Sequence, residues 1–266
     1  MTKAKVIGMG HYLPDRVVTN FDLEKVMDTS DQWIKERTGI SERRFFDPEK
    51  DTVANMAARA SNLALKQSGI DIKDILVVGA EIQSSALEMN DRGRSVSVIF
   101  ADGAGALILQ ATDDSDNQGI LSTHLHADGR FAEELYVRDP GSSRKERLTK
   151  EMIDDVGIRA HMNGNVVFKH AVVKFQEVIH EALEANQLKI DDIDLLIPHQ
   201  ANLRINQFVQ KQLGLGDDQV FNNIMHCGNT TAASIPIAMC EAWDEGRLKP
   251  DDLLCIAAFG SGFTWA

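Results

Sequence analysis

Two short polar motifs contain the side chains best suited to chemistry in this sequence. His199 follows an apolar run at 194–198 and opens the motif HQANLR, and Asn229 lies within GNTTAAS at 228–234. An imidazole and a carboxamide that donate hydrogen bonds to one oxygen stabilise an enolate formed by decarboxylation. Taken singly, His199 is more typical of a structural histidine and Asn229 of a helix cap. As a pair they indicate an oxyanion-stabilising site.

A glycine-rich turn near the end of the sequence is the third element of the predicted site. Gly260, Ser261 and Gly262 follow an apolar run within FGSGFTW at 259–265. Glycines let backbone N–H groups approach an oxyanion closely. The alternative is a simple β-turn without a role in chemistry.

The elements that must position these motifs alternate between strand and helix. Apolar periodicity predicts helices at 52–68, 166–188, 202–213 and 230–245, and strands at 3–8, 75–82, 95–100, 106–111, 120–126, 194–198, 219–223 and 253–259. This alternation predicts an α/β fold with a mostly parallel sheet, in which ligands gather at the carboxyl ends of the strands. The first half contains few helices for its strands, which indicates that a covering layer is missing there.

Composition excludes several classes of function. The 266 residues carry a net charge of -12, which disfavours nucleic acid as the main partner. No apolar stretch reaches the ~18 residues of a membrane span, so a cytoplasmic protein without membrane contact is expected. The three cysteines, Cys227, Cys240 and Cys255, are too few and odd in number for a disulfide framework.

Neither a metal nor a cofactor is predicted. His124 and His126 alternate on one predicted strand, but the sequence shows no third ligand with standard spacing. The segment ADGAGA at 101–106 lacks the G-x-G-x-x-G spacing of a dinucleotide loop and is interpreted as a tight turn between closely packed strands.

Together these motifs resemble the β-ketoacyl-acyl-carrier-protein synthase III family of condensing enzymes, over nearly the whole chain. Six blocks are similar to the family's signatures and occur in the same order: WIKERTGISERR at 33–44, DRGRSVSVIFADGAGA at 91–106, THLHADG at 123–129, PHQANLRI at 198–205, GNTTAASIP at 228–236 and FGSGFTWA at 259–266. The resemblance implies a thiolase-like α/β fold of two duplicated halves in αβαβα layers, here 1–150 and 151–266, with the N-terminal half incomplete. It also implies a homodimer.

The reaction that the resemblance implies joins an acyl-CoA primer to malonyl-acyl carrier protein and initiates fatty acid biosynthesis. His199 and Asn229 fall where the family polarises the malonyl thioester carbonyl. The residues at positions of the family's pantetheine and nucleotide channel are Thr29, Trp33, Arg37, Met162, Gly164, Phe168 and Asn202. Arg204, Lys169 and Lys211 fall on the family's carrier-protein patch, and Arg204 and Lys211 are seven apart, on one helix face.

The sequence departs from the family at the nucleophile. The family's reactive cysteine lies in a segment of roughly fifty residues that is absent between Ile75 and Leu76, more than one ~30-residue βαβ unit. None of the three cysteines has the family's motif. Cys227 lies two residues before Asn229, but a catalytic thiolate needs a lowered pKa, and we do not expect Cys227 to replace the missing residue.

Three hypotheses follow from this departure. The chain is an excised form of a condensing enzyme, or it is a catalytically incomplete homologue that acts as a non-condensing partner subunit or a malonyl decarboxylase. The third hypothesis is a starter-unit ketosynthase or acyltransferase of secondary metabolism. The walls of the family's acyl pocket lie in the absent segment, so the sequence does not determine the primer.

Overall fold

A computed structural model describes residues 3–70, 75–112, 118–142, 145–155 and 157–266. The helices are α1 (Asn20–Glu24), α2 (Asp31–Thr38), α3 (Val53–Ser68), α4 (Arg94–Ser97), α5 (Lys150–Asp154), α6 (Gly164–Ala185), α7 (Leu203–Leu213), α8 (Ile224–Cys227) and α9 (Ser234–Asp244). The strands are β1 (Lys3–Tyr12), β2 (Arg16–Thr19), β3 (Glu42–Phe45), β4 (Ile75–Glu81), β5 (Gly103–Thr112), β6 (His126–Ala127), β7 (Leu135–Val137), β8 (Ala160–Met162), β9 (Leu195–Pro198), β10 (Leu254–Ala257), β11 (Phe259–Gly260) and β12 (Thr264–Trp265).

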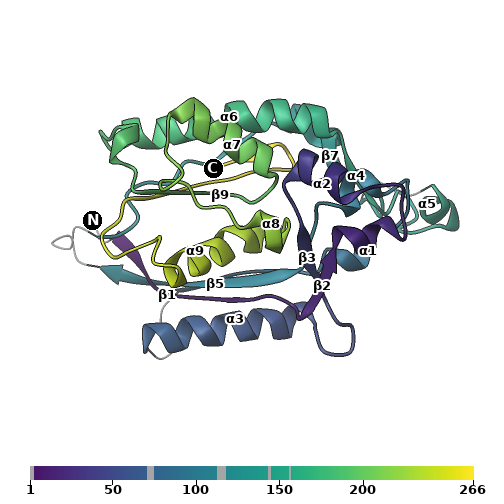
Figure 1. Ribbon diagram of the computed structural model, residues 1–266, viewed down its shortest axis with the longest axis horizontal. Helices are drawn as coiled ribbons and strands as arrows, with labels where there is room; N and C mark the ends of the chain where they lie inside the picture. The colour runs from purple at the N-terminus through teal and green to yellow at the C-terminus, as the bar shows by residue number, and fades with distance from the viewer. Residues whose placement is uncertain (1–2, 71–74, 113–117, 143–144, 156) are drawn as a thin grey trace.

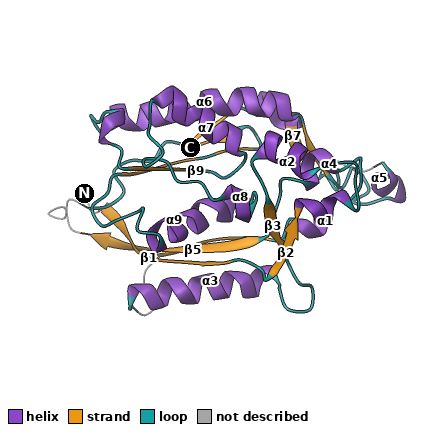
Figure 2. Cartoon of the chain, in the orientation of Figure 1, coloured by secondary structure: helices purple, strands orange, loops and turns teal. Residues whose placement is uncertain are grey.

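The molecule is built in five layers, which Figures 1 and 2 show edge-on. Helix α3 lies on the outside of a sheet with strand order β1-β5-β4, and α9 covers the other face of that sheet. The strands β9 and β10 lie beyond α9, and α6 and α7 form the opposite outer layer. The predicted αβαβα arrangement is therefore confirmed.

Small residues let the helices approach the first sheet closely. A Cβ at Gly10 would lie 2.3 Å from the carbonyl oxygen of Ala60 in α3. On the other face, a Cβ at Gly105 would lie 2.5 Å from the Cβ of Pro236 in α9. Because β5 is in direct contact with α9, the first sheet fixes the position of the segment that precedes α9, which contains Asn229.

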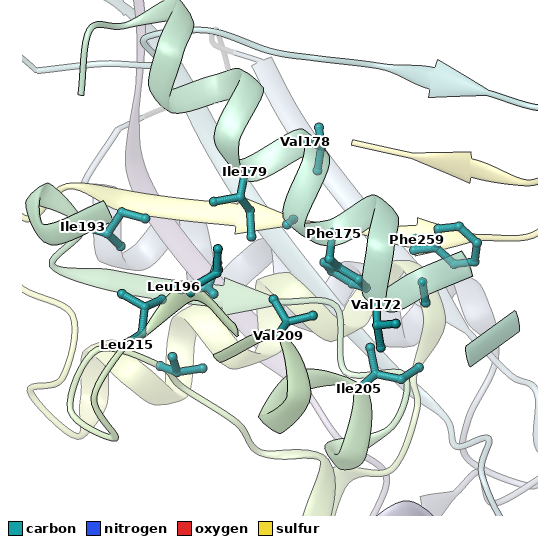
Figure 3. Close-up of a cluster of buried hydrophobic side chains, with 14 of the residues drawn as sticks. Val172, Phe175, Val178, Ile179, Ile193, Leu196, Ile205, Val209, Leu215 and Phe259 are labelled. Carbon is teal, nitrogen blue, oxygen red and sulfur yellow. The ribbon is translucent and has the colours of Figure 1, made fainter. Parts of the chain in front are cut away.

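The second half has its own apolar core between α6, α7 and the β9–β10 pair, shown in Figure 3. Helix α6 buries Val172, Phe175 and Ile179, whose spacing of three and four places them on one helix face. Leu196 of β9 and Val209 of α7 complete this cluster. The core holds the carboxyl end of β9, and therefore His199, on a rigid support.

Some predicted elements are wrong, because strands need partners that sequence patterns do not reveal. The segment 95–100 begins with helix α4, and only Phe100 makes an isolated bridge, to Asn229. The segment 120–126 is mostly irregular, since only His126 finds a pairing strand, β12. In the segment 219–223, only Val220 pairs, with Leu196.

The prediction of a mostly parallel sheet is also wrong. Strand β5 pairs antiparallel with both β1 and β4, and only the β9–β10 pair is parallel among the ladders of the described residues. The connection from β4 to β5 contains only short helical turns, so the chain returns along the sheet in the opposite direction.

The first sheet has an open side at β4. Val77 is 44% and Val78 38% exposed, and within the part of the chain that the structure describes β4 pairs with β5 alone. This agrees with the expectation of missing cover, although α3 and α9 cover the sheet more fully than the sequence suggested.

The division at residues 150 and 151 stays a prediction, and the structure does not describe 143–144 and 156 of that region. Among the described residues, no helix is long and apolar enough to cross a membrane.

Candidate active site

His199 lies directly after β9, where the parallel β9–β10 pair ends. Its backbone N–H donates to the carbonyl oxygen of Ala257 over 2.8 Å, which extends the pairing of the two strands by one bond. The side chain is partly buried, and its Nδ1 lies 2.6 Å from Oγ of Ser234, the first residue of α9. The imidazole is thus fixed at the carboxyl end of a strand, as expected.

Asn229 lies in the loop between α8 and α9 and is 6% exposed. Its backbone N–H donates to Ile99 O over 3.0 Å, and its carbonyl accepts from Ala101 N over 2.8 Å. The side-chain Oδ1 accepts from Thr231 N over 2.9 Å. This bond uses the amide oxygen and leaves the Nδ2 group to donate to a bound molecule.

Two polar side chains hold the His199 and Asn229 segments together. The Oε1 of buried Gln200 accepts from the N–H groups of Asn223 and Ile224, over 3.1 and 3.3 Å. At the other end, Ser234 Oγ contacts His199 Nδ1 and lies 3.4 Å from Gln200 N. The stretch that contains Asn229 is therefore tied to the end of β9 both before and after Asn229.

The same contacts determine the protonation of His199. Burial lowers its pKa to about 4, so the ring is neutral at pH 7. Because Ser234 Oγ accepts from Gln200 N–H, its own hydroxyl proton is free to point at Nδ1. A hydrogen bond accepted at Nδ1 leaves the ring proton on Nε2. His199 is then a neutral hydrogen-bond donor through Nε2.

This pKa predicts a pH dependence of stability. The unfolded His199 binds a proton below pH 6.5, whereas the folded one does so only below about 4. The free energy of unfolding therefore falls as the pH drops through this window, by at most about 1.4 kcal/mol per pH unit. Urea titrations at pH 7 and pH 5 measure the loss, and His199→Gln should lose less stability than the native chain. Equal losses in both proteins would contradict the assignment.

The glycine-rich segment forms a hairpin turn. Gly260 ends β11 and pairs with Thr264 of β12, Ser261 and Gly262 lie in the turn between the two strands, and Thr264 Oγ1 donates to Ser261 O over 3.0 Å. The turn follows β10, whose Ala257 accepts from His199 N. The turn therefore lies just beyond the strand next to His199, and its role toward an oxyanion stays a prediction.

Part of the predicted channel comes together around Trp33. The guanidinium groups of Arg37 and Arg94 lie 4.6 and 4.8 Å from the centre of its ring. Asn202 caps α7 and donates from Nδ2 to Arg37 O over 3.0 Å. Thr29 directly precedes Ser30, the N-cap of α2. Cation–π contacts of this kind provide a flat, positively charged surface.

Other predicted channel residues lie on two neighbouring elements. Met162 ends β8 and lines a cavity of about 390 Å³, whose wall also includes Ser97 of α4. Gly164 begins α6, and Phe168 lies one turn later, with its ring 5.7 Å from the guanidinium of Arg204. The cavity therefore borders α4, which also supplies Arg94, but neither His199 nor Asn229 lines it.

The three predicted carrier-protein contacts are exposed side chains of the α6–α7 layer. Arg204 and Lys211 lie on α7, and Lys169 lies on α6, which packs against α7. The arrangement of cations on one outer layer is consistent with an acidic partner.

None of the three thiols is suited to act as a nucleophile. Burial is the main cause that raises the pKa of each, to about 12 for Cys240 and about 11 for Cys255. The pKa of Cys227 is raised further, because burial adds to the charge of Glu241, to which its Sγ donates over 3.7 Å. A reactive cysteine needs the opposite shift, which supports the expectation that Cys227 does not replace the missing residue.

Sequence reasoning missed Gln200, Ser234 and Arg94 as residues of the site. Gln200 and Ser234 lie inside the two motifs already identified, but their contacts join positions 23 and 35 residues apart. Arg94 belongs to the block DRGR, and its contact with Trp33 spans 61 positions. Such pairs become visible only in three dimensions.

Two family models match the chain. The family model described as 3-oxoacyl-[acyl-carrier-protein (ACP)] synthase III matches residues 55–129, and the model of its C-terminal part matches 183–266. The second range includes His199, Asn229 and the glycine-rich turn.

One relative and two solved structures illustrate the likeness. The chain is 38% identical to a β-ketoacyl-[acyl-carrier-protein] synthase III of Alkalilimnicola ehrlichii, over 328 positions that cover 100% of this chain and 98% of the relative. The 3-oxoacyl-[acyl-carrier-protein] synthase III of Aquifex aeolicus has a TM-score of 0.86 and 34% identity, with 98% and 97% of the two chains covered. The priming β-ketosynthase of the R1128 polyketide pathway has a TM-score of 0.87 and 25% identity, with 99% and 94% covered.

The relative from Alkalilimnicola ehrlichii is longer than this chain within the region that the two share. Their alignment spans 328 positions, whereas this chain has 266 residues, so the relative contains residues that have no counterpart here. This agrees with the internal absence inferred from the sequence.

Proposed function

The chain belongs to the 3-oxoacyl-[acyl-carrier-protein] synthase III family, and from this premise we propose that its residues provide the decarboxylating step in the condensation of an acyl-CoA primer with malonyl-acyl carrier protein, the reaction that initiates fatty acid biosynthesis. The observation that carries the proposal is the tie between His199 and the Asn229 loop through Ser234 and Gln200. This tie supports the proposal that His199 and Asn229 act as two neutral donors to one oxygen near the end of β9.

The residues of this chain provide the decarboxylating half of the reaction. As the bond between the malonyl carboxylate and its α-carbon breaks, the electron pair moves into an enolate, and the thioester oxygen becomes negative. His199 Nε2–H and Asn229 Nδ2–H donate to that oxygen, and carbon dioxide leaves. A partly buried, preorganised pair of donors stabilises this charge at little reorganisation cost. A neutral imidazole suits the role because it remains a donor at pH 7.

The other half of the reaction, acyl transfer to a thiolate, has no nucleophile in this chain. The raised pKa values of Cys227, Cys240 and Cys255 favour a second candidate function for the 266 residues alone, decarboxylation of malonyl-acyl carrier protein without condensation. The enolate then takes a proton from solvent and becomes an acetyl group. In a condensing enzyme the same enolate attacks the acyl-cysteine.

A decarboxylation assay tests the shared step. The chain is incubated with malonyl-acyl carrier protein labelled in the free carboxyl group, and released carbon dioxide is trapped and counted. We expect release above the rate without protein, together with acetyl-carrier protein in the mass spectrum. Absence of both products from folded protein would overturn the proposed role of His199 and Asn229.

We place the carrier protein on the α6–α7 layer, over Arg204, Lys169 and Lys211. Arg204→Glu should weaken its binding at least tenfold, because the change replaces attraction by repulsion toward an acidic partner. Lys66→Glu on α3, in the opposite outer layer, is the matched control and should bind as the native chain does. Surface plasmon resonance with immobilised carrier protein measures both. Equal loss in the two variants would show a non-specific charge effect.

The acyl-CoA is proposed to lie along Trp33, Arg37 and Asn202 and toward the cavity beside Met162, Gly164 and Phe168, with Thr29 at the start of α2. Support comes from the cation–π cluster at Trp33 and from the opening of that cavity beside α4. The similarity to a priming β-ketosynthase keeps a starter-unit role in secondary metabolism as the alternative within this class.

A homodimer in the cytoplasm completes the proposal. The open edge of β4, with Val77 and Val78 exposed, offers unpaired backbone groups and apolar surface to a second copy. Light scattering after size exclusion measures the mass in solution.

A further inference from the structure

A cluster of three potential metal ligands lies beside the candidate active site and has no part in the proposed reaction. His226 and Cys227 belong to α8, and Glu241 belongs to α9. One ligand atom from each lies within 4.8 Å of the others, a closeness that no other three such side chains reach among the described residues. The two helices flank the loop that carries Asn229.

The distances in the cluster match the edges of a tetrahedral zinc site. His226 Nε2 lies 3.1 Å from Glu241 Oε2, and Cys227 Sγ lies 3.7 Å from Glu241 Oε1. Zinc bonds of about 2.0–2.2 Å to N and O and about 2.3 Å to S, at tetrahedral angles, give edges of about 3.4 Å between N and O and about 3.6 Å between S and O. An ion bound by both carboxylate oxygens needs little movement of these side chains.

The surroundings provide an orienting group and a path for entry. Asn223 is 1% exposed and donates from Nδ2 to Glu241 Oε2 over 2.8 Å, which orients the carboxylate. The Oδ1 of Asn223 is buried without a hydrogen-bond partner. His226 is exposed and lines a cavity of about 420 Å³ together with Glu245, so an ion can reach the cluster from solvent.

We propose that His226, Cys227 and Glu241 form a binding site for a divalent transition-metal ion of the zinc class. A thiol, an imidazole and a carboxylate are the ligand set of zinc and cobalt, whereas magnesium and calcium take oxygen ligands only. The imidazole, the thiolate and the two oxygens of the carboxylate would supply the four donor atoms of such a site. On binding, the Cys227 thiol releases one proton to solvent. This departs from the sequence-based prediction that the chain holds no metal.

The ion would link α8 to α9 across the Asn229 loop. Both ends of this loop would then be fixed, because Cys227 lies two residues before Asn229 and α9 begins five residues after it. Binding to the folded state alone raises stability by mass action. The site therefore acts as a clamp on the loop that carries the amide donor.

A second histidine cluster provides a matched comparison. His124 Nδ1 lies 3.2 Å from Glu181 Oε1, and His126 Nε2 lies 2.6 Å from Glu181 Oε2. These two rings contact opposite oxygens of one carboxylate, and the three residues do not converge on one point as the first cluster does. This cluster also has no thiol, so it cannot give a thiolate–metal signal.

Cobalt titration tests the proposal, because a thiolate bound to cobalt gives a charge-transfer absorption that other ligands lack. We expect one Co²⁺ per chain with this band, displaced by one equivalent of Zn²⁺. Cys227→Ser should abolish the band, and His226→Gln, at a half-exposed position that tolerates substitution, should weaken affinity at least tenfold. Cys255→Ser and His126→Gln should leave both unchanged.

Two outcomes would overturn the proposal. One is the absence of a charge-transfer band in folded native protein titrated with Co²⁺. The other is a band that persists in Cys227→Ser, or an affinity for Co²⁺ that His226→Gln leaves unchanged. Decarboxylation does not use these side chains, so failure of the metal site and failure of the proposed function are separate results.

Discussion

His199→Ala is expected to slow the release of carbon dioxide from malonyl-acyl carrier protein by about 10²–10³-fold, and Asn229→Ala by a similar factor. Each substitution removes one of two donors to the thioester oxygen where negative charge develops. The loss should appear in kcat more than in KM, because the donors act most strongly in the transition state. Steady-state assays of the labelled substrate measure both constants.

Matched variants separate this effect from general damage. His180→Ala removes an exposed histidine of α6 and should keep full activity. Ser234→Ala should cost about fivefold, because it removes the hydrogen bond that orients His199, worth about 1 kcal/mol, together with the long contact to Gln200 N. The fold loss of kcat in the double variant His199→Ala/Asn229→Ala should be smaller than the product of the two single losses, since the donors act as a unit. Full multiplicativity, or an unchanged kcat in His199→Ala, would refute a shared oxyanion.

Condensation is the reaction with the largest expected deficit. The 266-residue chain should form no acyl-enzyme with acetyl-CoA and no β-ketoacyl product, while carbon dioxide release persists. The reason is that a thiol with a raised pKa is protonated at pH 7 and does not attack a thioester. Intact-mass spectrometry after incubation with acetyl-CoA detects an adduct directly.

The triple variant with Cys227, Cys240 and Cys255 changed to serine is the control for this prediction, and in metal-free buffer its carbon dioxide release should equal that of the native chain in the same buffer. Insertion of the cysteine-bearing segment of a relative between Ile75 and Leu76 should restore both the adduct and the condensation product. An acetyl adduct on a cysteine of the native chain would contradict the prediction. Peptide mapping would then identify the residue.

Local sequence was sufficient for the elements whose stability depends on near neighbours. The helix predicted at 52–68 is present as α3, with Thr52 as its N-cap and Gly69 in the left-handed conformation at its end. Likewise, Asn202 caps α7 and Gly214 ends it. Caps and apolar periodicity involve residues three or four positions apart, so a single sequence contains them completely.

The two motifs of the candidate site could also be identified from the sequence, but the contacts that hold them in place could not. His199 and Asn229 stand out by residue type and by their place after predicted strands. The contacts that hold them, through Ser234 and Gln200, join segments that lie far apart along the chain. Type and spacing identify the donors, whereas only packing shows which nitrogen of His199 is free to donate.

The sequence by itself determined the αβαβα fold class, the two donor motifs, the family resemblance and the absence of its cysteine motif. The tertiary structure decided the antiparallel direction of the first sheet, the helical turn at 94–97, the lowered pKa of His199, the raised pKa values of the thiols and the approach of His226 and Cys227 to Glu241. The physical reason is common to all of these. Strand pairing, desolvation and ligand geometry depend on groups that folding brings together from distant positions, and no pattern of neighbouring residues specifies them.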